Sequence, residues 1–182
     1  MASLGHIAVG VAAARAHEGR FNWKAAVAFS TFSMFPDLDV IAFRFGIPYS
    51  SQWGHRGFTH SIAFALMVGA AGLLVTRSRK STLTLFIVVL THPLLDMLTD
   101  GGLGVALFWP LTNERYFFPW TPLPVAPIGK GMASARGLYV LAVEAAAFLP
   151  LWIYGFMRTP RGAEPAGATA LGTEKGRGEG QS

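Results

Sequence analysis

With 182 residues, of which 52% are apolar and only 14% charged, the chain is long enough for one domain and has the composition of an integral membrane protein. Its net charge of +5 comes from basic residues scattered over short loops, without the basic stripe of a nucleic-acid-binding surface, so no nucleic acid is expected as a partner. Because there is no cysteine, disulfides and cysteine-based zinc sites are excluded, and a metal would have to bind imidazole and carboxylate groups.

Apolar runs predict about five helices and therefore an all-α fold, an integral membrane helical bundle. These runs cover residues 4–16, 25–35, 60–76, 82–100 and 137–157. The first run is rich in Gly and Ala, which predicts close packing against a neighbouring helix. The last run, at about 20 residues, has the length that a bilayer core requires and is the clearest predicted span.

Two segments between the apolar runs are predicted as loops. Residues 40–58 are rich in aromatics, Gly and Pro, as expected at the level of lipid headgroups. Residues 101–136 have the same character and predict a long aromatic and Pro-rich loop, re-entrant or not, that lies over the site. Tryptophans in these loops are interpreted as interface anchors, with a ligand box as the alternative; they are Trp53, Trp109 and Trp120.

Residues 1–157 are thus predicted as one membrane-embedded domain, and residues 158–182 as a disordered cytoplasmic tail. The basic loop residues set the expected orientation, because positive loops face the cytoplasm. They are Arg15, Arg20 and Lys24, then Arg77, Arg79 and Lys80, then Arg158 and Arg161. With these loops inside, the acids and histidines described next lie toward the non-cytoplasmic side of the inner (cytoplasmic) membrane.

A polar stripe is predicted at the end of the 82–100 helix. His92, Asp96 and Asp100 are spaced four residues apart, so on a helix they share one face. A carboxylate shielded from water is costly, and a metal ion or a partner charge is the usual remedy. The stripe therefore indicates a binding site rather than a lipid-facing surface.

Three other helix ends carry the same residue types. His6 opens the first predicted helix, and His60 opens the third, with Thr59 as a candidate N-cap. Pro36 should end the second helix, which leaves Asp37 and Asp39 in the turn after it. Four helix ends thus bring acids and imidazoles to one layer.

Imidazoles and carboxylates with an open position for water suit one or two zinc ions, or another divalent ion such as manganese. Asp96 is the candidate bridge between two ions, Asp37 a ligand, and Asp39 either an acceptor that orients a ligand or a general base. Together with Asp39, His55 and Asp100 complete the predicted catalytic set.

Two further charged residues have open alternatives. Arg56 is a candidate for binding a substrate phosphate through its fork of N–H groups, or it pairs with Asp39 or with a lipid headgroup. Glu144, inside the last apolar run, is either a buried structural acid or a contact of the site.

Four motifs resemble the membrane-bound metal-dependent hydrolase family often called YdjM-like, over roughly residues 1–110 by motif and up to residue 157 by helix pattern. They are His6, the turn Phe35-Pro36-Asp37-Leu38-Asp39, the run His55-Arg56-Gly57-Phe58-Thr59-His60-Ser61, and His92-Pro93-Leu94-Leu95-Asp96. That family is similar in turn to zinc-dependent phospholipase C, an all-helical enzyme whose zinc cluster uses His and Asp. The resemblance implies metal roles for His6, Asp37, His60, His92 and Asp96. The phospholipases' further downstream His and Glu ligands are absent, so one or two metals are expected rather than three.

These residues lead to a first hypothesis, a metal-dependent hydrolase that uses metal-activated water to attack a phosphoester. Its expected partners are membrane lipids and a small-molecule or lipid phosphoester. A second hypothesis is ion- or proton-coupled transport, although the sequence has no internal symmetry of the kind transporters show. A third is a metal that only staples the bundle for a structural or regulatory role. The sequence leaves the substrate and the oligomeric state open.

Overall fold

The computed structural model describes residues 3–157, which fold into six α-helices and three short 3₁₀ helices. The α-helices are α1 (Ser3–Glu18), α2 (Trp23–Met34), α3 (Ile62–Thr76), α4 (Arg79–Asp96), α5 (Ala135–Ala147) and α6 (Leu149–Phe156). The 3₁₀ helices are η1 (Phe35–Phe45), η2 (Phe58–His60) and η3 (Gly129–Ala133). Within the described residues the extended pairings are two isolated bridges, so the all-α prediction is confirmed. The predicted tail, residues 158–182, lies outside them.

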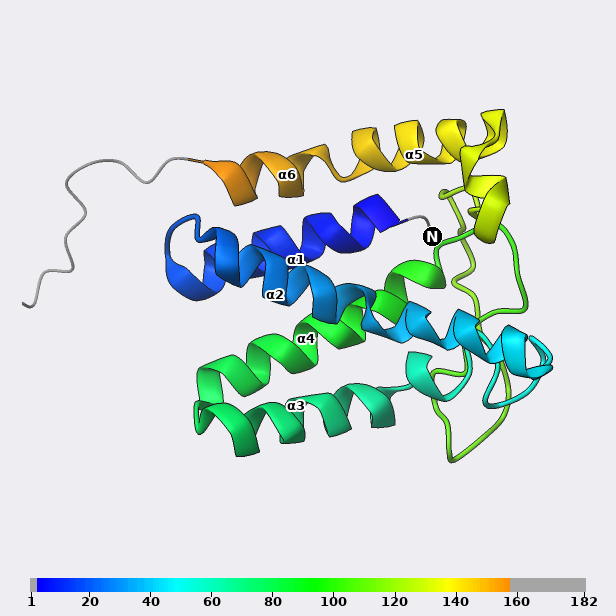
Figure 1. The fold of residues 1–182 in the computed structure, drawn as a ribbon, viewed down its shortest axis with the longest axis horizontal. Coiled ribbons are helices and arrows are strands. Elements are labelled where there is room, and N and C mark those ends of the chain that lie inside the picture. Colours follow the sequence, from blue (N-terminus) through cyan, green and yellow to red (C-terminus); the bar gives the residue numbers. More distant parts are fainter. Residues whose placement is uncertain (1–2, 158–182) are drawn as a thin grey trace, which may run out of the picture.

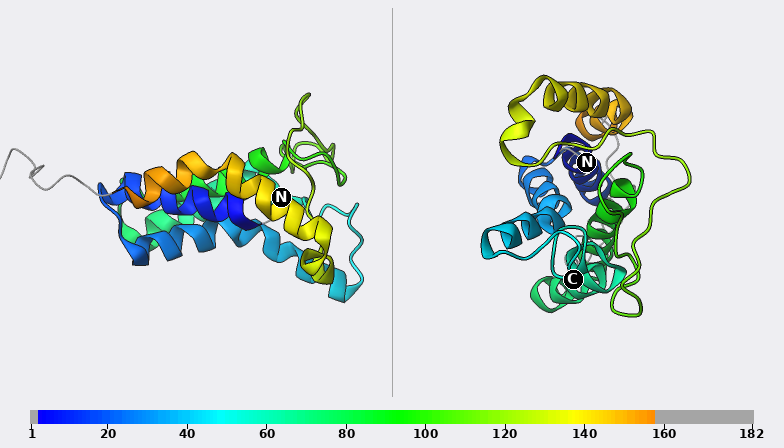
Figure 2. Two further views of the ribbon diagram at one scale, coloured as in Figure 1. Left: turned by 90° about the horizontal axis from the view of Figure 1, so that it is seen from above. Right: turned by 90° about the vertical axis from the view of Figure 1, so that its right-hand side faces the viewer.

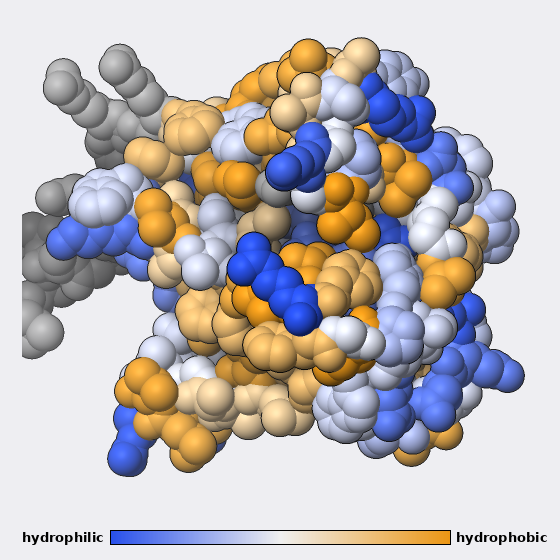
Figure 3. All heavy atoms as spheres, turned by 45° about the vertical axis from the view of Figure 1, so that its right-hand side comes forward, coloured by the Kyte–Doolittle hydropathy of each residue, from blue (hydrophilic) through white to orange (hydrophobic). Residues whose placement is uncertain are grey.

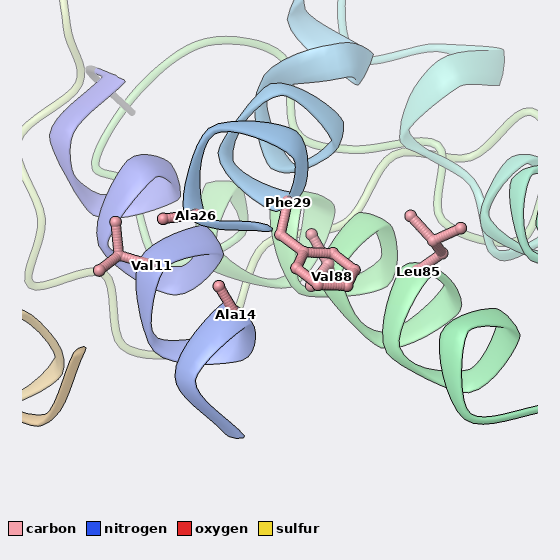
Figure 4. Packing of buried hydrophobic residues seen from close by; sticks show 6 residues of the cluster. All are labelled: Val11, Ala14, Ala26, Phe29, Leu85 and Val88. Carbon is pink, nitrogen blue, oxygen red and sulfur yellow. The ribbon is translucent and has the colours of Figure 1, made fainter. Parts of the chain in front are cut away.

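The α-helices run along one long axis, so that the connecting segments gather at the two ends of the bundle (Figure 1). Helix α1 packs against α2, α4, α5 and α6. The end-on view in Figure 2 shows it between the α5–α6 pair and the other helices. A cluster of buried apolar side chains joins α1, α2 and α4 (Figure 4): Val11, Ala14, Ala26, Phe29, Leu85 and Val88.

Small residues allow the helices to approach closely, as the Gly- and Ala-rich first run predicts. A Cβ atom on Gly10 would lie 2.3 Å from the Cα atom of Ser30 in α2, so a larger residue would separate the two helices. A Cβ atom on Gly155 in α6 would lie 2.5 Å from a methyl carbon of Val11. Helix α1 is therefore held on two sides through glycine contacts.

The last apolar run is not one straight helix, which corrects the prediction of an unbroken span at 137–157. The helix breaks at Phe148, and α5 and α6 meet at a bend of 58°. Pro150 explains the break, because a proline has no N–H group to continue the helical bonding and is tolerated only in the first turn of a new helix.

Membrane-span candidates are fewer than the predicted bundle of about five helices requires. Among residues 3–157, the combined segment Trp23–Phe45 is one continuous helix of 23 residues that is long and apolar enough to cross a bilayer. The bent pair α5–α6 would be a second candidate if it forms one span. The helical fold is confirmed, but an integral bundle of five spanning helices is not.

Proline does not end the second helical segment in the way predicted. After Pro36 the chain continues as the 3₁₀ helix η1 up to Phe45, and Gly46 ends it in the left-handed conformation with φ of 73°. A proline at the start of a helical segment costs nothing, because the N–H groups there have no partner within the segment. Asp37 and Asp39 therefore lie within η1 rather than in an irregular turn.

The ends of α3 and α4 also differ from their predictions. Ser61, not Thr59, caps α3, and its side chain accepts a hydrogen bond from the N–H of Phe64 at 3.1 Å. Helix α4 ends at Asp96 and does not reach Asp100, because the chain turns tightly there. The N–H of Asp100 instead donates to the carbonyl of Leu123 at 2.9 Å, so the long loop captures this segment.

Residues 101–128 form an extended loop, as predicted, whereas η3 and the start of α5 lie within the last part of the predicted loop. A partly buried set of contacts holds the loop in place. The guanidinium of Arg115 donates to the main-chain carbonyls of Tyr49, Ser51, His55 and Gly104 at 3.0 to 3.3 Å. It thereby joins this loop to the segment that follows η1. Figure 3 shows polar residues gathered toward this loop end, whereas hydrophobic residues dominate the helical body.

Candidate metal centre

Four side chains from three elements converge at the loop end of the bundle: Asp37 of η1, His60 of η2, and His92 and Asp96 of α4. Their ligand atoms all lie within 4.8 Å of one another. The Nε2 atoms of His60 and His92 are 3.1 Å apart, and Asp37 Oδ1 lies 3.4 Å from the Nε2 atom of His92. Asp96 Oδ2 lies 3.5 Å from the Nε2 atom of His60. In a tetrahedral zinc site with bonds near 2.0 Å, neighbouring ligand atoms are about 3.3 Å apart. The cluster thus has the size of a single-ion site.

Hydrogen bonds on the far side of each ring orient both imidazoles. The Nδ1 atom of His92 lies 2.7 Å from the carbonyl oxygen of Ser33, so it carries the proton and donates. In a 3₁₀ pattern that carbonyl would accept from residue 36, but Pro36 has no N–H, which leaves the carbonyl to His92. The Nδ1 atom of His60 faces Thr59 Oγ1 at 3.0 Å and Asp39 Oδ2 at 3.2 Å. Both Nε2 atoms are therefore aimed at the cluster.

Asp39 serves as the acceptor that holds this arrangement. Its two oxygens accept hydrogen bonds from the Nδ1 atom of His55 at 2.7 Å, the main-chain N–H of Arg56 at 3.1 Å and the hydroxyl of Thr59 at 2.6 Å. With the contact to His60, four groups surround one carboxylate. This geometry fits the orienting role among the two predicted for Asp39, because its lone pairs are already engaged and leave little capacity for a general base.

The guanidinium of Arg56 is engaged in contacts within the protein, although Arg56 also lines a pocket beside Asp37, so its role as a substrate ligand stays a prediction. Its side chain is only 2% exposed, and its Nε atom pairs with Asp96 Oδ2 at 3.0 Å. Its Nη atoms donate to the carbonyl of Gly101 at 2.9 Å and to the hydroxyl of Thr99 at 3.0 Å. The side chain of Arg56 therefore forms a buried ion pair, as one of the alternatives predicted, but its partner is Asp96 rather than Asp39. Arg56 holds a cluster carboxylate in place.

His6 lies beside the cluster rather than in it. Its ring stacks on that of His92 with a centroid distance of 3.8 Å, and its Nε2 atom lies 3.6 Å from Asp96 Oδ1. Both ring nitrogens are buried and have no hydrogen-bond partner among residues 3–157. Because the two oxygens of Asp96 face different histidines, this geometry leaves room for the bridging role predicted for Asp96.

Glu144 is fully buried and accepts a hydrogen bond from the N–H of Gly5 at 3.1 Å. It thereby fixes the first turn of α1 one residue before His6, where a helix has N–H groups without partners of their own. This contact supports the structural alternative for Glu144 and also explains how α5 positions a histidine of the site.

A pocket with both polar and apolar walls, which we call the polar pocket after its acidic, basic and hydroxyl-bearing residues, gives access to the cluster. Its volume is about 290 Å³, and its walls include Asp37, Tyr49, His55 and Arg56. The side chain of Asp37 is 22% exposed, whereas those of the other three cluster residues are at most 1% exposed, so a molecule in the pocket would meet the cluster at Asp37. The three tryptophans predicted as interface anchors are not among the pocket's lining residues.

Asp100 lies outside the cluster, which corrects the predicted stripe. Its carboxylate is 48% exposed, accepts from the N–H of Val125 at 2.6 Å and lies 3.9 Å from the Nη2 atom of Arg136. Because α4 ends four residues earlier, the helical spacing that would align Asp100 with Asp96 is lost. A catalytic role for Asp100 has no support from this position.

Three carboxylates, those of Asp37, Asp39 and Asp96, face His60, and among the described residues the guanidinium of Arg56 pairs with one of them, Asp96, so the cluster has an excess of negative charge. Burial lowers the pKa of His60, but contacts with these three acids raise it by more, to about 10. The site thus favours a cation, either a proton on His60 or a metal ion. An all-oxygen magnesium site would not use two imidazoles, so the donor set suits a transition metal such as zinc.

Metal binding is expected to become tighter as the pH rises. With a pKa of about 10, His60 carries a proton on both nitrogens at neutral pH, and a metal can bind its Nε2 atom only after one proton leaves. The apparent affinity for zinc should increase about tenfold per pH unit between roughly pH 6 and 8. Titration against a competing chelator, corrected for the protonation of the chelator itself, measures this slope. If the affinity does not change with pH, the metal does not displace a proton from His60.

Two contributors to the site were not identified from the sequence. The sequence favours Thr59 as a helix cap, yet its hydroxyl contacts Asp39 and His60. The carbonyl of Ser33 orients His92, and the signal for it is the proline three residues later. Both contributions depend on contacts between segments far apart in sequence.

Comparisons with known proteins agree with the motif resemblance. The model of a family described as YdjM inner membrane protein matches residues 1–161. The inner membrane protein YbcI of Escherichia coli (strain K12) is 43% identical over 101 residues, which are 52% of this chain and 58% of that protein. The match thus spans less than two-thirds of the relative's length. No solved structure matches the chain.

Proposed function

The chain belongs to the YdjM inner membrane protein family, and we propose that it is a metal-dependent hydrolase that cleaves a phosphoester with water. The observation that carries this proposal is the convergence of Asp37, His60, His92 and Asp96 at the spacing of one metal ion. The chain is an inner membrane protein, like its family and its E. coli relative. The elements that carry these residues, η1, η2 and the end of α4, meet at the loop end of the bundle (Figure 1).

Zinc is the ion we propose, with manganese as the alternative. When bound, such an ion acts as a Lewis acid that polarises a phosphoryl oxygen and activates water near neutral pH. The four cluster side chains would hold it, and His6 with the second oxygen of Asp96 would provide part of a site for a second ion. Three of these ligands are already oriented by neighbouring groups. Ser33 holds His92, Asp39 holds His60, and Arg56 holds Asp96.

In this proposal His55 moves the proton of the reaction. Hydrolysis joins the oxygen of water to phosphorus, breaks the ester P–O bond and releases an alcohol, so one proton passes from the water to the leaving oxygen. His55 lines the polar pocket beside Asp37, and its Nδ1 atom donates to Asp39 at 2.7 Å. This bond leaves the Nε2 atom as the nitrogen that exchanges a proton with a molecule in the pocket.

Replacing His55 with glutamine is expected to lower kcat by about 10²- to 10⁴-fold, the usual contribution of a positioned proton carrier. Metal bound at the four-residue cluster should stay at the wild-type level, because His55 is not one of its ligands and belongs instead to a separate group of potential ligands with Asp39 and His60. Rates and metal content measured on the same detergent-purified samples test this expectation, and an unchanged kcat would remove His55 from the mechanism.

Hydrolysis itself is tested with the full chain, purified in detergent and loaded with zinc or manganese. The substrates are a soluble phosphodiester, a soluble phosphomonoester and phospholipid vesicles. We expect release of the alcohol from at least one of them, loss of this activity on chelation, and recovery on adding the metal back.

A metal-loaded wild-type protein that hydrolyses none of these substrates would overturn the proposal. Unfolding on chelation would then favour a metal that only staples the bundle. Ion flux into liposomes that depends on Asp96 would instead favour transport.

A further inference from the structure

A second cavity, an apolar groove, runs along α1, α2 and α6. Its volume is about 560 Å³, within the range of roughly 300 to 1,000 Å³ that is typical of small-molecule sites. Its walls include Ile7, Val11, Val27, Met34, Trp152 and Phe156, and no charged side chain lines it.

The two hydroxyl groups that line the groove have no free proton to donate. Ser30 donates to the carbonyl of Ile7 at 3.2 Å, and Thr31 donates to the carbonyl of Val27 at 2.9 Å. Their protons are therefore used within the helices. A molecule that fills the groove gains mainly from burying apolar surface, which favours one that is apolar along its length.

The groove also lies where hydrocarbon chains are available. Helix α2 belongs to the segment Trp23–Phe45, and α6 belongs to the bent pair, so both candidate membrane spans contribute to its walls. In an inner membrane protein, a groove between such segments faces acyl chains rather than water.

One end of the groove adjoins the candidate metal centre. Met34 lines both the groove and the polar pocket, so the two cavities share a wall. Phe35 and Leu38 line the groove and flank Asp37, the partly exposed residue of the metal cluster. A chain in the groove would therefore bring its polar end to the pocket that contains Asp37 and His55.

We propose that the groove binds one acyl chain of a phosphate-bearing lipid and that the lipid's phosphate enters the polar pocket beside Asp37. This inference rests on the proposed function for the reaction and names its substrate class, an amphiphile with a long chain. Binding of the chain can be measured independently of hydrolysis.

The test uses a single-chain phospholipid with a photoreactive diazirine at the end of its chain, added to the metal-loaded full-length protein in detergent. After irradiation, mass spectrometry of the peptides should locate the adducts on α1, α2 and α6. An unlabelled alkyl phosphate of equal chain length should compete more strongly than the alkyl alcohol, because the alcohol lacks the phosphate.

Substitutions at two neighbouring positions provide a matched pair. Val27→Trp fills the groove from a side chain that is 58% exposed, and we expect it to lower labelling about tenfold, the cost of roughly two buried methylene groups. Ala28→Trp alters the next residue, which is also exposed but does not line the groove, and labelling should be unchanged. In Val27→Trp the ratio of hydrolysis of a long-chain to a soluble phosphodiester should fall by a similar factor.

Several outcomes separate this inference from the proposed function. Labelling spread equally over the exposed apolar residues of α3, such as Leu74 and Val75, would indicate annular lipid only and overturn the groove as a site. An unchanged ratio in Val27→Trp, in a protein that hydrolyses the soluble substrate, would overturn it as well while the hydrolase proposal stands. Selective labelling without any hydrolysis would support chain binding and overturn the hydrolase.

Discussion

Alanine in place of His60 or His92 is expected to abolish stoichiometric binding of a divalent metal. Each substitution removes one of four converging ligand atoms. Both side chains have no exposed surface, so bulk water cannot take the place of the missing ligand. Loss of a group that only orients a ligand already costs about 10- to 100-fold in metal affinity, so loss of the ligand itself should exceed that range. Metal analysis of detergent-purified protein, together with a chelator competition, measures the effect.

His17→Ala is the matched control for these variants. His17 belongs to α1 but lies outside the cluster, and its Nδ1 atom is 3.0 Å from the hydroxyl of Thr84. The control should retain wild-type metal content, so a loss in His60→Ala can be attributed to the site rather than to a removed imidazole in general. If His60→Ala and His92→Ala bind metal as tightly as the wild type, the cluster is not a metal centre.

Replacing Arg56 with alanine is expected to destabilise the fold by about 3–5 kcal/mol, the usual cost of breaking a buried ion pair. Arg56 is 2% exposed and its partner Asp96 is 1% exposed, so neither charge could be solvated by bulk water after the change. The substitution also removes donors to Thr99 and Gly101, and with them a contact between the metal cluster and the long loop. Unfolding in mixed micelles, followed by the fluorescence of the five tryptophans, gives the free-energy difference.

Arg136→Ala supplies the comparison for this prediction. Arg136 forms a long and exposed pair with Asp100, with side chains that are 51% and 48% exposed, and such a surface pair contributes about 0–1 kcal/mol. Arg56→Ala should therefore unfold far more readily than Arg136→Ala. Equal stability of the two variants would mean that the ion pair between Arg56 and Asp96 does not hold the loop end together.

The local part of the site could be predicted from the sequence. His92 and Asp96 are one helical turn apart, and the apolar run before them predicts a helix, so their common face follows from helix geometry alone. Pro36 marks the change in conformation that brings Asp37 to the same end, although the chain continues as a 3₁₀ helix instead of a loop. The small residues of α1 likewise predict its close packing, because only a missing side chain allows such an approach.

The ends of helices were less well predicted, since they depend on competing contacts. Asp100 continues the four-residue spacing, yet α4 stops before it. Its N–H donates to the carbonyl of Leu123, and its carboxylate accepts from the N–H of Val125, both in the long loop. Thr59 and Ser61 are both good caps by residue type. The hydroxyl of Thr59 donates a hydrogen bond to Asp39, so Ser61 is the residue whose side chain caps α3.

The sequence by itself determined an all-helical membrane protein with acids and imidazoles at one end of its helices, because hydrophobic periodicity and helical spacing are properties of neighbouring residues. Only the tertiary structure decided that Arg56 pairs with Asp96, that Asp39 joins His55 to His60, and that α1, α2 and α6 leave a groove beside Asp37. Each of these contacts joins residues from separate segments. Their formation depends on how whole helices and loops pack, which no local pattern encodes.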